Sequence, residues 1–223
     1  MLPKTVETYL NKYALRGWET EPVEIKNIST AIVIPAIREY KNIRKLINSF
    51  AENNQKYFNS TLIIFVINNS ALSSDQIKED NKKSIYFLNS IIFHNSSMED
   101  ELINKVCKSG LKIGLVDASS AGKELPQKDA GVGLARKIGM DSALLIFDYN
   151  SPYKKILVCL DADCTVENNY ITEIVDHFNA RSLFAAVVNY AHKTEGSDEE
   201  PNAIICYEIF LRYYELGLKF ANS

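Results

Sequence analysis

A run of five apolar residues, 156–160, ends abruptly in two aspartates, Asp161 and Asp163. The run is too short for a stable helix, and its continuous apolar character predicts a strand buried on both faces. Since residues i and i+2 of an extended segment point the same way, we expect both carboxylates to converge on one point. Ligands of open parallel sheets bind at the carboxyl ends of the strands. The stretch therefore predicts a site for Mg²⁺ or Mn²⁺ that also holds a diphosphate.

An Asp-x-Asp spacing by itself is weak evidence, because a solvated loop after a strand often contains such a pair. Here the pair directly follows an apolar strand, and residues 167–169 then lead into a helical pattern. That position favours a functional role over a solvated loop.

Composition limits the classes of protein that the chain can represent. Its 223 residues suffice for one large domain or two small ones, and 46% hydrophobic and 24% charged residues are ordinary for a globular protein. The net charge of −3 argues against a nucleic-acid partner, and no apolar run approaches the ~20 residues of a membrane span. The 4 cysteines lack a Cys-x-x-Cys spacing, which indicates reduced thiols. We expect a cytoplasmic protein, either free or at the inner face of a membrane.

Apolar runs and helical patterns alternate along the chain and predict an α/β fold with a mostly parallel sheet flanked by helices. The first strand is closed by Pro35, which cannot donate to a ladder. The first strand–helix–strand unit should have a right-handed crossover. The predicted strands span 30–34, 61–67, 111–116, 155–160 and 184–188, and the predicted helices span 5–18, 40–57, 75–92, 98–108, 131–145, 170–178 and 203–220.

Residues 131–139 form a glycine-rich entry into a helix and allow two interpretations. Backbone N–H groups at such an entry can cradle a phosphate, although the common phosphate-binding patterns are absent. Alternatively, the small residues permit close packing of the helix on the sheet. Arg136 favours an anion, because a guanidinium suits a phosphate.

The end of the chain predicts a helix that needs a partner. After a charged loop over 193–202, the helix of residues 203–220 carries apolar side chains on nearly every side. Such a helix is either deeply buried or lies against another surface. We expect it to associate, for example with a second copy in a homo-oligomer.

Together, these motifs resemble the family 2 inverting glycosyltransferases of the GT-A fold, over about residues 29–192. The matching stretches are 32–39, 66–70, 129–139 and 160–163. The third is the most specific, because it resembles the family's Asn-x-Gly-x-Ala-x-Ala-Arg-Asn-x-Gly run. The resemblance implies a Rossmann-like nucleotide-diphospho-sugar transferase domain over 29–192, a helical extension over 1–28, and a segment over 193–223 that leads into an acceptor half.

The resemblance also implies roles for individual residues. Pro35, Ala36 and Glu39 would line the nucleoside pocket, and Arg136 would lie near the donor. Asp161 would face the ribose or the metal, and Asp163 would be the main ligand of Mn²⁺ or Mg²⁺. The partners would be a nucleotide-diphosphate sugar and an acceptor hydroxyl on a saccharide or lipid-linked molecule.

The chain departs from the family pattern at three places. Ile67 and Asn68 replace the Asp that reads the base, so a uracil preference does not carry over, although Asn68 can still orient a base edge. Asp129 and Lys137 replace two Asn of the third motif. No acid beyond Asp163 stands in a motif suited to the catalytic base; Glu208 and Glu215 are the remaining candidates. We therefore expect the 223-residue chain to be the front portion of a longer protein that does not transfer sugar by itself.

Two other classes of function remain open from the sequence. Residues 160–166 also fit the Asp-x-Asp-x-Thr/Val motif of haloacid dehalogenase-type phosphatases, with Asp161 as nucleophile and Asp163 as acid. In that family the motif usually lies on the first strand, whereas here it falls late in the chain. The other class is a non-catalytic nucleotide-sugar-binding domain.

Overall fold

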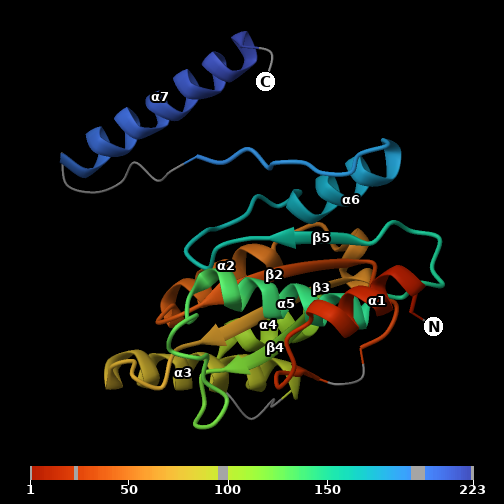
Figure 1. Ribbon diagram of the computed structural model, residues 1–223, viewed down its shortest axis with the longest axis vertical. Coiled ribbons are helices and arrows are strands. Elements are labelled where there is room, and N and C mark those ends of the chain that lie inside the picture. The colour runs from red at the N-terminus through yellow and green to blue at the C-terminus, as the bar shows by residue number, and fades with distance from the viewer. Residues whose placement is uncertain (1, 23–24, 95–99, 192–198, 222–223) are drawn as a thin grey trace. The chain divides into compact units, whose positions relative to one another are not determined.

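The computed structural model describes residues 2–22, 25–94, 100–191 and 199–221 (Figure 1). It divides into two compact units, one up to residue 183 and one from residue 184 onward. The first unit holds the sheet and the predicted site. The second holds one long helix.

The first unit is built on a five-stranded sheet in the order β1-β4-β3-β2-β5. Four strands run parallel and the short β1 is antiparallel to β4. The prediction of an α/β fold with a mostly parallel sheet flanked by helices is confirmed. The strands are β1 (Thr20–Glu21), β2 (Thr30–Ala36), β3 (Thr61–Asn68), β4 (Lys112–Ala118) and β5 (Ile156–Cys159).

Helices cover both faces of the sheet, which explains why β2 and β3 are apolar throughout and buried at every residue. One face packs against α2, α3, α4 and α6, and the other packs against α5. Side chains alternate between the faces, so that Ile32 contributes to the first core and Val33 to the second. The helices are α1 (Lys4–Tyr13), α2 (Tyr40–Ala51), α3 (Asp75–Ile92), α4 (Glu101–Ser109), α5 (Val132–Ile146), α6 (Tyr170–Ala180) and α7 (Glu199–Phe220), with a 3₁₀ helix, η1, over Gln55–Ser60.

The predicted strand over 184–188 is wrong, because the structure shows no strand there and Phe184 is fully exposed. The side of the sheet on which α6 lies gives the physical reason. The crossover from β2 through α2 leads towards β4, and α6 packs on the same face as α2. A parallel strand added beyond β5 through α6 would therefore need a left-handed crossover, which proteins almost never use.

The prediction that residues 155–160 form a central strand buried on both faces is also wrong. β5 is shorter and, among the described residues, is an edge strand that pairs with β2 alone; its Leu157 is 37% exposed. An apolar run predicts a strand, but the number of its neighbours depends on segments elsewhere in the chain.

Two helices end earlier than predicted. The predicted helix 40–57 ends at Ala51, because the Asn53 side chain donates to the Ser49 carbonyl and η1 follows. The predicted helix 5–18 ends at Tyr13, and the chain then extends into β1, which the sequence patterns did not predict. Trp18 lies in this connection and donates its indole N–H to the Lys123 carbonyl at 2.7 Å.

Pro35 does not close its strand, because β2 continues to Ala36. The Val33 carbonyl accepts from Leu160 N–H, so alternate residues of β2, including position 35, face the β5 side. Pairing with β5 stops at Val33. Pro35 thus lies beyond the last residue that pairs with β5. Its lack of an N–H therefore costs no hydrogen bond between the two strands.

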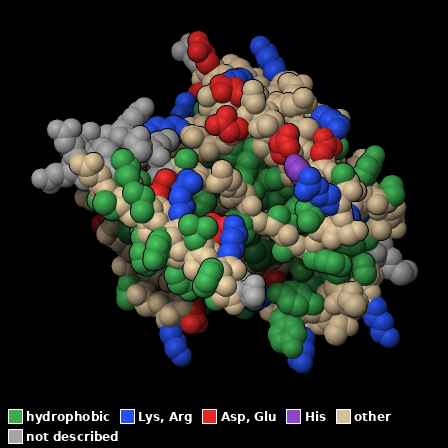
Figure 2. All heavy atoms as spheres, turned by 90° about the horizontal axis from the view of Figure 1, so that it is seen from above, with side chains coloured by type: hydrophobic (Ala, Val, Ile, Leu, Met, Phe, Trp, Pro, Cys, Tyr) green, Lys and Arg blue, Asp and Glu red, His purple; other side chains and the backbone are tan. Residues whose placement is uncertain are grey.

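The second unit consists mainly of α7, whose apolar side chains are widely exposed. Figure 2 shows apolar side chains, coloured green, on one face of the molecule. Its charges form i,i+4 pairs, Glu208 with Arg212 at 4.0 Å and Glu215 with Lys219 at 2.6 Å. Association of this helix with a second copy stays a prediction. No helix among the described residues combines the length and apolar character that crossing a bilayer requires.

Candidate functional site

The topology places a switch point between β2 and β5. The chain leaves β2 towards β3 and β4, and it returns through α5 to the opposite side of β2. Loops after two such neighbouring strands diverge and leave a crevice at their carboxyl ends, where open α/β sheets bind ligands. The loop after β2 contains Glu39, the loop after β5 contains Asp161 and Asp163, and α5 begins at the same edge because it runs antiparallel to the strands.

The two aspartates lie in a turn and not in an extended segment. The Cys164 N–H donates to the Asp161 carbonyl at 3.4 Å, and β5 has already ended at Cys159. The strand alternation invoked from the sequence therefore does not apply. Ala162 is buried, whereas Asp161 and Asp163 are exposed, so the turn still presents both carboxylates to solvent.

Arg136 reaches this turn from the beginning of α5. Its Nη2 donates to Asp161 Oδ1 at 2.7 Å, and the side chains of Arg136 and Asp161 are 32% and 61% exposed. The Arg136 Nε is buried and has no hydrogen-bond partner within the described part of the chain. The structure thus brings together two predicted residues that are 25 positions apart.

The glycines at the start of α5 and within it support different interpretations of this stretch: one glycine serves close packing on the sheet, and two leave space for a phosphate. A Cβ on Gly139 would lie 2.4 Å from Val33 Cγ1, so this glycine permits close packing of α5 on the sheet. A Cβ on Gly131 or Gly133 would meet nothing within 4 Å. The entry to the helix is therefore open space, and its free N–H groups favour an anion there.

The donor set fits a hard cation only in part. Within the described ranges, no three His, Cys, Asp or Glu side chains gather into a group that could hold a metal ion. Asp161 and Asp163 could supply two carboxylate ligands, and Mg²⁺ is commonly held by one or two carboxylates with water and substrate phosphates. A cation at this turn would thus depend on oxygens from a bound ligand.

The neighbouring thiols do not compete as ligands. Burial raises the pKa of Cys159 and of Cys164, and the Asp161 charge acts in the same direction on both. Arg136 opposes the shift at Cys159 without reversing it. Mg²⁺ and Mn²⁺ in any case prefer oxygen to sulfur ligands, so the carboxylates are the better donors for such a cation.

The three residues predicted to line the nucleoside pocket differ in how far they are exposed. Pro35 and Ala36 are buried at the end of β2. Glu39 stands immediately before α2, is partly exposed, and accepts from Asn42 Nδ2 at 2.6 Å. Of these three residues, Glu39 offers a side chain that a ligand could reach.

Asn68 points into the protein. It is 2% exposed, and its amide nitrogen donates to the Ala36 and Val66 carbonyls at 3.0 and 3.3 Å. Asn81 from α3 donates to the Asn68 carbonyl and to Asn69 Oδ1 at 3.0 and 2.8 Å. Sequence reasoning assigned no role to Asn69 or Asn81; for Asn69, the polar run directly after a fully apolar strand was the available signal. This asparagine network fastens the end of β3 to β2 and α3.

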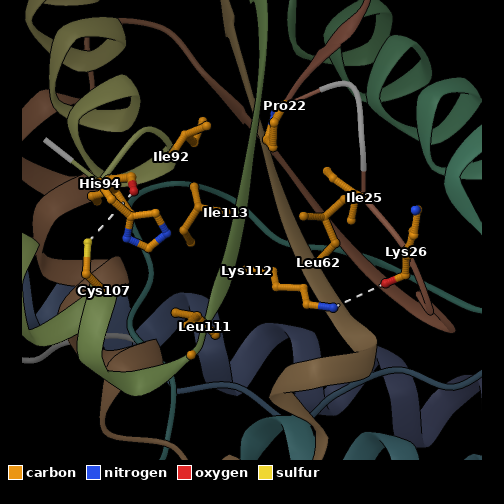
Figure 3. A pocket seen from close by; sticks show the side chains of 12 residues that line it. Pro22, Ile25, Lys26, Leu62, Ile92, His94, Cys107, Leu111, Lys112 and Ile113 are labelled. Carbon is orange, nitrogen blue, oxygen red and sulfur yellow. Dashed lines mark hydrogen bonds between the residues drawn. The ribbon is translucent and has the colours of Figure 1, made fainter.

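A cavity of about 320 Å³ lies at the opposite edge of the sheet, where β3 and β4 begin (Figure 3). Leu62, Leu111 and Ile113 line it together with His94 and Cys107. Lys112 also lines it, but its ammonium group donates to the backbone carbonyls of Lys26 and Asn59. The Lys112 ammonium group is thus already engaged, and this cavity lies at the amino ends of the strands, away from the edge where open parallel sheets bind ligands.

Comparison of the chain with protein-family models, with curated proteins and with solved structures found no match in any of the three. The assignment of the site therefore rests on its geometry and chemistry, together with the motif resemblance.

Proposed function

We propose that the chain is the donor-binding part of a GT-A-type glycosyltransferase of family 2, which transfers a sugar from a nucleotide diphosphate to an acceptor hydroxyl with inversion. The observation that carries the proposal is the Arg136 guanidinium held 2.7 Å from Asp161 at the carboxyl ends of β2 and β5. A cation, two exposed carboxylates and an open helix N-terminus meet where such sheets bind ligands.

The chemistry of the reaction explains these parts. The leaving group is a nucleoside diphosphate, whose developing charge a Mn²⁺ or Mg²⁺ ion would stabilise. Asp161 and Asp163 would hold that ion, and Arg136 would bind a phosphate oxygen. Deprotonation of the acceptor hydroxyl needs a further carboxylate, for which Glu208 and Glu215 remain the sequence candidates.

Mn²⁺ should stabilise the protein more strongly when a nucleoside diphosphate is present. Two carboxylates leave most of the coordination sphere to water, and diphosphate oxygens would complete it. At ligand concentrations near 10 Kd, binding contributes about 1.4 kcal/mol, or about 3–6 °C in Tm for a chain of this size. Thermal unfolding with Mn²⁺, with UDP, GDP or dTDP, and with both ligands measures this coupling.

Asp163→Asn should remove the coupling with little loss of stability, because Asp163 is exposed. Glu79→Gln is the matched control, since Glu79 forms a surface pair with Lys82 on α3 at 3.5 Å. An unchanged Mn²⁺ response in Asp163→Asn would contradict the assignment of this residue as a ligand.

Binding should discriminate weakly among UDP, GDP and dTDP. Asn68 stands where the family has a base-reading region, but its amide donors are engaged with backbone carbonyls and Ile67 is fully buried. We expect the three Kd values from calorimetric titration to lie within about tenfold of each other, or about 1.4 kcal/mol. A preference for UDP on the order of 100-fold, about 2.7 kcal/mol, would show that other groups read uracil.

A further inference from the structure

We infer that Arg136 is a latch on the cation site: it neutralises Asp161 in the absence of ligand and moves to the diphosphate when the donor binds, which frees the carboxylate for the cation. The inference rests on the proposed function. It adds that binding of the cation and of the diphosphate are coupled through one side chain of the protein as well as through direct coordination.

The first ground is competition for a single group. Asp161 Oδ1 already accepts from Arg136 Nη2 at 2.7 Å. A divalent cation close to the same carboxylate would stand near a fixed positive charge, and the two would repel each other. Asp163 lies in the same turn, but among the described residues its carboxylate pairs with no Lys, Arg or His side chain and accepts from the Cys164 thiol at 3.8 Å. The latch therefore acts on one of the two proposed ligands.

The second ground is that Arg136 has more hydrogen-bond donors than its contact with Asp161 uses. A guanidinium carries five N–H groups, whereas one hydrogen bond to Asp161 accounts for one of them. Nε is buried and is not hydrogen-bonded within the described part of the chain, so the present position leaves a polar group unsatisfied. If the guanidinium turns towards phosphate oxygens beside the open start of α5, it can donate two hydrogen bonds in place of the single bond to Asp161.

The consequence is an order of events at the site. Without a diphosphate, Asp161 is neutralised and the turn offers a cation little more than Asp163 and water. When a diphosphate arrives, it attracts the guanidinium and supplies its own oxygens, and both changes favour the cation. The site should thus bind Mn²⁺ weakly by itself, as expected where no three-ligand group exists among the described residues.

Binding of Mn²⁺ alone, measured by electron paramagnetic resonance without nucleotide, tests the latch. Arg136→Met keeps the aliphatic length and removes the charge, and it should tighten Mn²⁺ binding about fivefold, the most that loss of an exposed ion pair provides. The same variant should bind UDP about tenfold more weakly in the presence of EDTA, because one charge-assisted phosphate contact is lost. Arg136→Lys should restore part of both properties, and circular dichroism verifies that each variant is folded.

Arg38→Met is the matched control, because it removes an exposed arginine from the loop after β2 at the same edge of the sheet. Equal changes in Mn²⁺ affinity for Arg38→Met and Arg136→Met would overturn the latch, since the effect would then be one of general charge. An unchanged affinity in Arg136→Met would also overturn it. Should Asp161→Asn and Asp163→Asn leave Mn²⁺ binding unchanged, the proposed function itself would fail, whatever Arg136 does.

Discussion

Replacing Asp141 by alanine should lower the free energy of unfolding by about 3 kcal/mol. Asp141 lies on α5, is 4% exposed, and its carboxylate binds three groups. It accepts from Tyr9 Oη at 3.1 Å, from Leu15 N–H at 3.2 Å and from Lys137 Nζ at 2.6 Å. Two of these donors belong to α1 and the segment after it, so the substitution should also loosen α1 from α5. Urea unfolding followed by circular dichroism measures the first effect, and limited proteolysis of residues 14–19 measures the second.

Glu79→Ala provides the control for removal of a carboxylate, because its surface pair should contribute less than about 0.5 kcal/mol. Tyr9→Phe removes the bond from α1 and leaves the ion pair with Lys137 in place. Lys137→Met would not separate the two, because Lys137 also donates to the Tyr13 carbonyl at 2.9 Å. A loss of less than about 1 kcal/mol in Asp141→Ala would contradict the assignment of Asp141 as the anchor of α1.

Replacing Gly139 by alanine should lower the free energy of unfolding by about 2 kcal/mol, although alanine is the better helix former. The new Cβ would lie 2.4 Å from Val33 Cγ1 and 2.8 Å from Val66 Cγ2. Both valines are fully buried in central strands and have stiff β-branched side chains, so α5 would have to move away from the sheet. Chemical denaturation of the variant measures the loss.

Gly133→Ala supplies a control within the same helix and should have the opposite sign. Its Cβ would meet nothing within 4 Å, so the gain in helix propensity of up to about 1 kcal/mol should remain. Val33→Ala should recover part of the stability in the Gly139→Ala background, because it removes the closest clashing methyl group. Equal effects of the two glycine substitutions would show that helix propensity and not packing decides at Gly139.

The candidate site was predictable in its chemistry and less so in its geometry. Asp161 and Asp163 could be chosen from their position directly after an apolar strand, and Arg136 could be chosen because a guanidinium near a glycine-rich helix entry suits a phosphate. Their arrangement could not, since the Arg136–Asp161 pair joins a helix and a turn that are 25 residues apart. The inward orientation of Asn68 was likewise hidden, because its partners include a carbonyl of β2 and the network extends to α3.

The sequence by itself determined the buried strands and the helices between them. The predicted helix over 75–92 coincides with α3, and the apolar runs of β2 and β3 fall where they were predicted. These features follow from local periodicity, because a segment covered on both faces must be apolar at every position. Only the tertiary structure decided that β5 is an edge strand, that residues 184–188 form no strand, and that β1 pairs with β4. Strand neighbours and crossover hand depend on where distant helices pack, and no local pattern records that information.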